Sequence, residues 1–137
     1  MATQAMSKPL FHANCVAVVD DEFSRIVGFA DRQFDTKRYL QFQLSDEGDE
    51  HDEALGLNTY YVEKDDQSNS CYGGIESIDL HTNTIRIKLN DVGSQRLDLD
   101  RVVLITFDAD EETLGELRSG LTTIFSGTNI LRDHMND

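Results

Sequence analysis

The sequence predicts an α+β fold, in which an antiparallel-rich sheet of about six or seven strands carries a C-terminal amphipathic helix. Residues 39–44 alternate apolar and polar side chains with the period of two that is typical of a strand with one buried face. Residues 84–89 repeat that alternation. Near the C-terminus, five apolar residues recur at helical spacing and form one stripe: Leu114, Leu117, Leu121, Ile124 and Phe125.

Further strands are predicted in the first half of the chain. Residues 11–19 are mainly apolar and end at an acidic turn, and residues 24–30 follow, so the two segments predict a hairpin. Gly28 predicts a bend or bulge, because a glycine inside a strand often marks one. Residues 45–56 are rich in charged side chains and predict a solvated loop. Residues 57–63 are aromatic and β-branched, which favours a strand.

The second half predicts another hairpin and a buried strand. Residues 75–80 and 84–89 flank a His-Thr-Asn loop, which is typical of a hairpin. The apolar residues of the first of these segments break strict alternation, as a bulge would. Residues 91–100 predict a turn or short helix. Residues 101–107 are apolar on both faces and predict a central strand that is covered on both sides.

The C-terminal helix has recognisable ends. Asp108 lies three residues before Glu111, as in a capping box, and further acids in the first turn complement the helix dipole. Gly127 stands just beyond the apolar stripe and predicts the C-terminal cap.

Length and cysteine content limit the class of protein. A chain of 137 residues predicts one domain, 1–137, in which we expect residues 1–10 and 128–137 to be loosely ordered tails. The sequence has no apolar run long enough for a membrane span, and its start does not have the pattern of a secretory signal. Its two cysteines, Cys15 and Cys71, form neither a disulfide framework nor a zinc pattern. We therefore expect a cytoplasmic protein.

Charge is the strongest feature of the composition. Asp and Glu number 26 against 12 Lys and Arg, which gives a formal net charge of −14. A negative field of this size repels nucleic acids and anionic membranes and attracts basic proteins. We therefore expect neither a nucleic acid nor a membrane as partner. The alternative interpretation is that the acidity only keeps the protein soluble.

The segment DDQSNSCYGGIESIDL, residues 65–80, is the least generic part of the chain. Counted from Asp65 as a calcium loop, only Glu76 at the twelfth position matches the pattern. Gly73 and Gly74 lead into a strand instead of opening a helix, which argues against a phosphate cradle. The segment predicts a turn at residues 65–70 and a shaped return to the sheet, with no metal and no cofactor.

No catalytic motif emerges from the sequence. The four histidines belong to no familiar metal or nucleophile pattern, and a buried cysteine is the commoner explanation for Cys71. One alternative hypothesis is a small hydrolase or metal-binding enzyme that uses Cys71, His51 and nearby acids. Another is a scaffold protein that forms a homodimer through an exposed strand edge.

A long stretch of the chain resembles a known family. YLQFQLSDEGDEHDEALGLNTYYVEKDDQSNSCYGGIESIDL, a following strand pair and ELRSGLTTIF resemble the immunity protein 10 family of bacterial polymorphic toxin systems. The resemblance covers residues 39–125. Its most specific parts are the acidic loop that leads into ALGLNTY at 54–60, the YGGI step at 72–75 and LRSGL at 117–121. Residues 1–38 and the tail after Gly127 lie outside the resemblance.

The resemblance implies a small cytoplasmic antidote that neutralises a cognate toxin by binding it, without catalytic residues or a cofactor. The net charge adds the hypothesis that the toxin is basic. The candidate contact residues are acidic: Asp46, Glu47, Asp49, Glu50, Asp52, Glu53, Asp65, Asp66, Glu112 and Glu116. For each of them the alternative is an ordinary solvated surface. We expect four further residues to shape the fold: Tyr60, Tyr72, Gly73 and Gly74.

Overall fold

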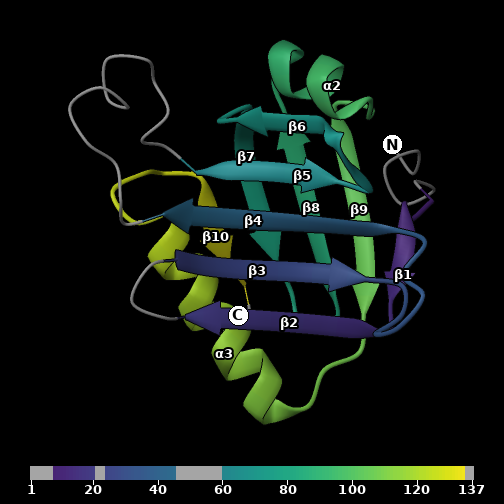
Figure 1. Cartoon of the computed structure of the whole chain (residues 1–137). Helices are drawn as coiled ribbons and strands as arrows, with labels where there is room; N and C mark the ends of the chain where they lie inside the picture. Colours follow the sequence, from purple (N-terminus) through teal and green to yellow (C-terminus); the bar gives the residue numbers. More distant parts are fainter. Residues whose placement is uncertain (1–7, 21–23, 46–59, 135–137) are drawn as a thin grey trace.

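The computed structural model describes residues 8–20, 24–45 and 60–134. Within these residues the chain forms ten strands and two helices, and the strands are arranged in two five-stranded sheets (Figure 1). The predicted α+β class is confirmed. The strands form two mostly antiparallel sheets, where the sequence predicted one sheet of six or seven strands.

The first sheet, which we call the meander sheet, consists of neighbouring strands in sequence order. It contains β2 (Cys15–Asp20), β3 (Ser24–Ala30), β4 (Tyr39–Ser45), β5 (Tyr61–Lys64) and β6 (Asp66–Tyr72), all antiparallel. The predicted β2–β3 hairpin is confirmed. The predicted bend or bulge at Gly28 is wrong, because Gly28 pairs in regular register with Ala17 and Gln41.

The second sheet, the mixed sheet, has the order β1-β9-β8-β7-β10. Its strands are β1 (Phe11–Ala13), β9 (Val102–Phe107), β8 (Thr84–Leu89), β7 (Ile75–Leu80) and β10 (Leu131–Asp133). The predicted β7–β8 hairpin and the bulge near Ile75 are confirmed. The two edge strands β1 and β10 run parallel to their neighbours. Residues 131–133 are thus a strand paired with β7, within a segment that we expected to be a tail.

Two predicted segments have a different structure. Residues 11–19 form two strands in different sheets, because β1 pairs with β9 and β2 pairs with β3 on either side of Asn14. The turn predicted at residues 65–70 is largely strand β6. The chain reverses at Asp65, whose φ is +61°, and the polar residues that follow form the edge of the meander sheet, where one face can remain wet.

Strand β9 is covered on one face only. Val103, Ile105 and Phe107 are at most 5% exposed, whereas Val102 on the other face is 38% exposed. The prediction of a strand covered on both sides is therefore wrong. The apolar residues on its outer face reflect β-propensity more than burial.

Helix α2 (Asp91–Leu97) confirms the short helix predicted there, and α3 (Glu111–Ile124) confirms the C-terminal helix. The N-terminal cap of α3 is Asp110, whose carboxylate accepts a hydrogen bond from the Thr113 amide at 2.8 Å. The predicted cap at Asp108 is displaced by two residues. At the other end the cap is Phe125, and Gly127 with its φ of +78° lies two residues further on.

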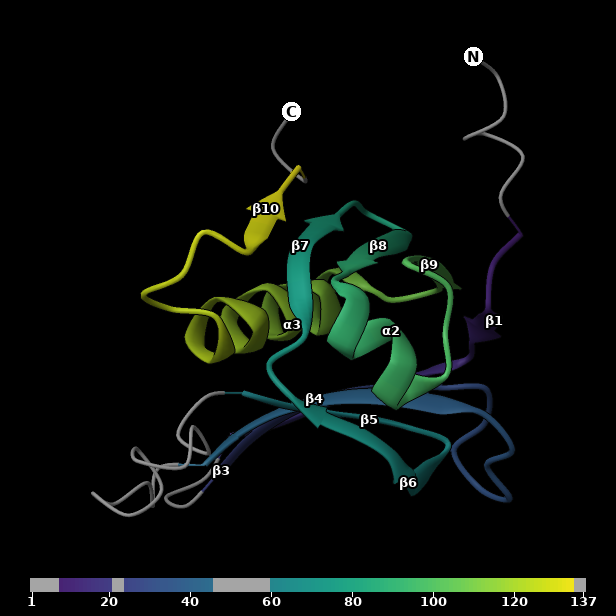
Figure 2. The same cartoon turned by 90° about the horizontal axis from the view of Figure 1, so that it is seen from above.

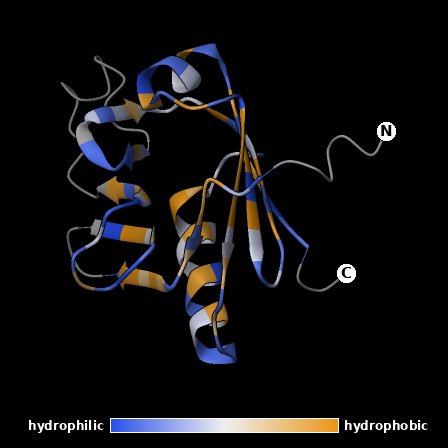
Figure 3. Ribbon diagram, turned by 90° about the vertical axis from the view of Figure 1, so that its right-hand side faces the viewer, coloured by the Kyte–Doolittle hydropathy of each residue, from blue (hydrophilic) through white to orange (hydrophobic). Residues whose placement is uncertain are grey.

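The core fills the space between the two sheets, where α3 also lies (Figures 2 and 3). Phe29 of β3 meets Phe107 of β9 across this space, with ring centroids 5.4 Å apart. Gly120 allows α3 to approach the meander sheet closely, because a Cβ at this position would lie 2.8 Å from Cγ2 of Val27. The apolar stripe of α3 is thus buried against the sheet, which accounts for the helix that the sequence predicted.

The chain crosses from the meander sheet to the mixed sheet at Gly73 and Gly74. Their φ angles are +79° and +93°, a region that side-chain-bearing residues rarely occupy. The carbonyl of Gly74 accepts a hydrogen bond from the Asn90 amide at 3.0 Å. Helix α2 packs directly on this crossover, because a Cβ on Gly93 would lie 2.2 Å from the Gly74 oxygen.

We expect Gly93→Ala to destabilise the fold by about 1–3 kcal/mol, because the added methyl group must push α2 away from the crossover. Urea unfolding followed by circular dichroism measures the change. Gly115→Ala is the matched control, since a Cβ there meets nothing within 4 Å and alanine favours the helix. Equal midpoints for Gly93→Ala and the wild type would contradict the close approach.

Candidate functional site

Three of the four residues expected to shape the fold lie together at the crossover. The Tyr60 hydroxyl accepts a hydrogen bond from the Ile75 amide at 3.0 Å, and the Tyr60 carbonyl accepts one from the Gly73 amide at 3.0 Å. The Tyr60 ring also packs on Phe125 beyond α3, with centroids 4.9 Å apart. Burial raises the pKa of Tyr60, so its hydroxyl stays protonated. Tyr60 thereby joins the crossover to the end of the helix.

Tyr72 lies apart from that cluster. Its side chain is 49% exposed, and its ring meets the Tyr61 ring at 5.1 Å between centroids. The register pairs these two tyrosines directly across β5 and β6, so they share one face of the meander sheet.

The predicted acidic contact residues do not form one patch within the described part of the chain. Six of them, at positions 46–53, lie outside the described residues. The Asp65 carboxylate accepts hydrogen bonds from the Tyr39 amide at 2.8 Å and from Nε of Arg38 at 3.0 Å. It therefore joins the β5–β6 turn to the start of β4. Asp66 is exposed and accepts a hydrogen bond from the Ser68 amide at 3.1 Å.

The two helical candidates, Glu112 and Glu116, are exposed on α3. This helix contacts β2, β3 and β4, whereas Asp65 and Asp66 lie at the turn between β5 and β6. The helical acids therefore lie near the β2–β3 end of the meander sheet, and the turn acids lie near its β5–β6 end (Figure 1).

Cys71 is a core residue. Its side chain is 4% exposed, and its thiol donates a hydrogen bond to the Tyr72 carbonyl at 3.5 Å. Burial raises the pKa of the Cys71 thiol, which disfavours the nucleophilic thiolate. His51, its partner in the enzyme hypothesis, lies outside the described residues.

The imidazole of His12 contacts a hydroxyl through one ring nitrogen and a carboxylate through the other. His12 Nδ1 is 2.7 Å from the Thr106 hydroxyl, and its Nε2 is 2.9 Å from an Asp108 oxygen. In a catalytic triad Nε2 faces the nucleophile and Nδ1 the carboxylate, so this arrangement is reversed. The three side chains join β1 to β9 and to the turn before α3. Sequence reasoning missed them because only the parallel pairing of β1 with β9 brings them together.

Asp79 is the centre of a second cluster that the sequence did not predict. Its carboxylate accepts a hydrogen bond from Arg132 at 2.9 Å and lies 2.8 Å from Nε2 of His134. The His81 ring stacks on His134, with centroids 4.7 Å apart. Burial by itself would raise the pKa of Asp79, but the hydrogen bonds from His134 and Arg132 outweigh it and lower the pKa below 3.8. These contacts hold β10 against β7.

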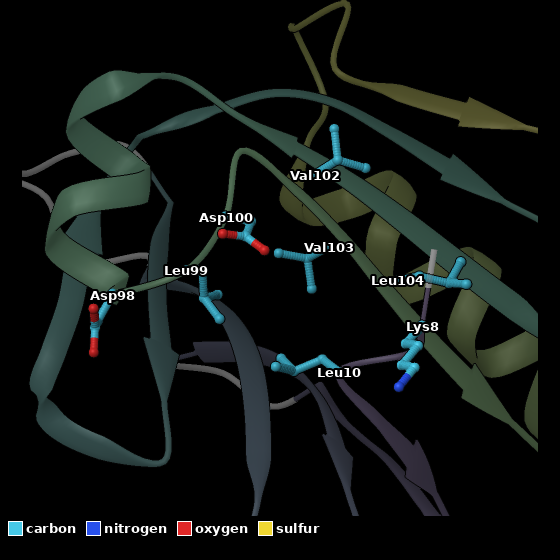
Figure 4. Close-up of a pocket in the computed structure, with 8 residues that line it drawn as sticks. All are labelled: Lys8, Leu10, Asp98, Leu99, Asp100, Val102, Val103 and Leu104. Atoms are coloured by element: carbon cyan, nitrogen blue, oxygen red, sulfur yellow. The ribbon is translucent and has the colours of Figure 1, made fainter. Parts of the chain in front are cut away.

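Several hollows of similar size open on the described surface. One, of about 340 Å³, lies between the N-terminal segment and the α2–β9 connection and brings Lys8, Asp98 and Asp100 around leucine and valine side chains (Figure 4). A second, of about 330 Å³, lies over Gly28 on the meander sheet, and a third, of about 400 Å³, lies along α3 beside Gly115. In residues 8–20, 24–45 and 60–134, no group of three or more His, Cys, Asp and Glu is placed to hold a metal ion. No helix of the described chain is long and apolar enough to cross a membrane.

Comparison with known families assigns the chain to one of them. Residues 12–115 match the family described as Immunity protein 10. The chain belongs to this family. No curated protein matches the chain, and neither does any solved structure.

The immunity protein 10 match begins earlier than the sequence resemblance predicted. It includes residues 12–38, which we expected to lie outside the family pattern, and it ends at Gly115, before the LRSGL segment. The family match therefore includes the strands of both sheets from His12 of β1 to the end of β9, and the crossover at Gly73 and Gly74. Strand β10 lies beyond it.

The Asp79 cluster predicts how stability depends on pH. The pKa of Asp79 is lower in the folded protein than its ordinary 3.8, so the carboxylate stabilises the fold above that pH. This stabilisation disappears as the pH falls through the folded-state pKa. We expect Asp79→Asn to lower the free energy of unfolding near neutral pH and to lower it by less at about pH 3, where part of this stabilisation is lost.

Urea unfolding at both pH values measures this dependence. Asp100→Asn, at an exposed position, is the control and should have little effect at either pH. An Asp79→Asn penalty that remained constant down to the acid limit would contradict the role of the ionised carboxylate.

Proposed function

We propose that this protein neutralises a cognate bacterial toxin by forming a complex with it, as one cytoplasmic domain without catalysis of its own. The observation that carries the proposal is the family match over residues 12–115. A chain built as an inhibitor needs a stable surface that fits its target, and it can do without a nucleophile.

The described side chains with catalytic chemistry support this proposal. Cys71 is buried with a raised thiol pKa, and the ring nitrogens of His12 bond a threonine hydroxyl and a carboxylate. Each of these groups satisfies its polar atoms within the fold. The His12 contacts hold β1 to β9, and Cys71 is part of the core, which is what a rigid binding domain requires.

The net charge of −14 supports a basic target. Opposite charges accelerate diffusional encounter, so an inhibitor with this charge would capture a basic toxin quickly. Speed matters for an antidote, because the toxin acts on the same cell until it is bound.

Titration separates inhibition by binding from an enzymatic mechanism. The toxic domain encoded by the neighbouring gene is first shown to arrest growth of cells, with rescue by co-expression of this protein. Purified toxin is then titrated with increasing amounts of the protein. We expect residual toxin activity to fall linearly and reach zero at a fixed stoichiometric ratio.

Cys71→Ala should inhibit the toxin to the same end point wherever it folds, since the buried thiol has no chemical role in binding. Complete inactivation by a small fraction of an equivalent, increasing with incubation time, would instead indicate that the protein modifies the toxin. Continued growth arrest despite full co-expression would sink the proposed function.

Salt dependence tests the electrostatic part of the proposal. We expect the association rate constant to fall on the order of 10-fold or more between low salt and high salt, because counterions screen the attraction. The dissociation rate should change much less. Stopped-flow fluorescence measures both rates, and an association rate that is independent of salt would refute steering by charge.

A further inference from the structure

The outer face of the meander sheet is not covered by any described element. Figure 2 shows α2, α3 and the mixed sheet all on the other side. The register places one row of side chains across the middle of this outer face, from β2 to β6. The row consists of Ala17, Gly28, Gln41, Glu63 and Ser70.

Small residues make this face concave. Gly28 has no side chain and lies between Ala17 and Gln41. Cys15 and Ala30 form the next pair on the same face. The hollow of about 330 Å³ lies over these residues, with Tyr39 among those that line it. A cavity of this size suits one large side chain from a partner.

A buried carboxylate lies next to the hollow in the same row. Glu63 is 8% exposed although it belongs to the outer face. Tyr39 donates its hydroxyl to one carboxylate oxygen, and Tyr61 donates to the other at 2.8 Å. None of the ion pairs in the described residues involves Glu63. Each oxygen retains a further acceptor position.

The surroundings of the Glu63 carboxylate favour a cation as its binding partner. Burying a carboxylate is costly unless it is paired, and two neutral hydroxyls offset that cost only in part. The tyrosines stay protonated. Burial and the hydrogen bonds to Glu63 raise the pKa of Tyr39 and of Tyr61, and in Tyr61 they outweigh the lowering by a hydrogen bond with Ser70. Tyr61 also packs on the exposed Tyr72, so the carboxylate borders an aromatic surface on which a guanidinium or ammonium group can lie.

We propose that the outer face of the meander sheet is the surface that binds the toxin, and that a basic side chain of the toxin enters the hollow over Gly28 and pairs with Glu63. This inference rests on the proposed function. The complementary chemistry is an arginine or lysine within a protein surface, since arginine pairs well with carboxylates and stacks on aromatic rings.

Charge argues against a second copy of the chain as the occupant. Two molecules of net charge −14 repel each other, and a symmetric contact through this face would bring two Glu63 carboxylates to the same contact. A basic toxin surface has the opposite sign. The two occupants are distinguished by the experiment below.

Gly28→Leu tests the hollow by filling it with a side chain of the protein itself. A Cβ at Gly28 lies 3.8 Å from the Gln41 Cβ, an ordinary contact, so the added side chain projects from the outer face. We expect the dissociation constant of the toxin complex, measured by calorimetry, to rise at least about 30-fold, as for a blocked hot spot. Gly115→Leu on α3 is the matched comparison and should stay within about twofold of the wild type.

Glu63→Gln tests the ion pair separately. Glutamine has nearly the same shape and keeps a side-chain oxygen for the tyrosines, but it lacks the charge. We expect about a 10-fold weaker complex and a shallower salt dependence of its affinity. Thermal unfolding verifies that each variant is folded. If Gly28→Leu does not fold, Gly28→Ala replaces it, with a smaller expected loss of affinity.

The outcomes separate this inference from the proposed function. If the wild type binds the toxin and both Gly28→Leu and Glu63→Gln bind equally well, the inference is wrong while the proposed function stands. If Gly115→Leu alone weakens the complex, the toxin contacts α3 and the inference is also wrong. A wild-type dimer that Gly28→Leu converts to monomers, with unchanged toxin affinity, would assign the face to self-association. If the wild type fails to bind the toxin at all, the proposed function itself fails.

Discussion

The close approach of Gly74 and Gly93 is the constraint on which the relative placement of the sheets depends. Backbone meets backbone there, so α2 lies directly against the step that carries the chain from β6 into β7. Tyr60 secures the same step from the other side, through hydrogen bonds to the Gly73 and Ile75 backbones and ring contact with Phe125. The spacing that results leaves room for α3 between the sheets.

The packing between the sheets also determines which residues lie on the outer face of the meander sheet. Most apolar residues of the meander sheet face α3 and the mixed sheet, so its outer face retains mainly small residues, amides and tyrosines. Glu63 is the exception on that face, because the hydroxyls of Tyr39 and Tyr61 hold its carboxylate close to the sheet. A rigid sheet that presents fixed donors, a carboxylate and a hollow is pre-organised for binding, which reduces the entropy lost when a partner arrives.

Strongly periodic segments were predicted well from the sequence, and non-periodic segments were not. The alternation at residues 39–44 and the stripe of α3 report burial directly, since a strand or helix with one buried face must show that period. The polar run of β6 shows no such period, because an edge strand tolerates serine and asparagine. Residues 11–19 were assigned to one strand, because nothing local indicates that the chain changes sheets at Asn14.

The sequence by itself determined the α+β class, the negative charge, the main hairpins, the C-terminal helix and the resemblance to the family. These properties follow from composition and from patterns within short windows. Only the tertiary structure decided that Gly74 meets Gly93, that Asp79 holds His134, and that Glu63 lies between two tyrosines beside Gly28. Such contacts join residues far apart in the chain, and local pattern carries no information about which distant strand becomes a neighbour.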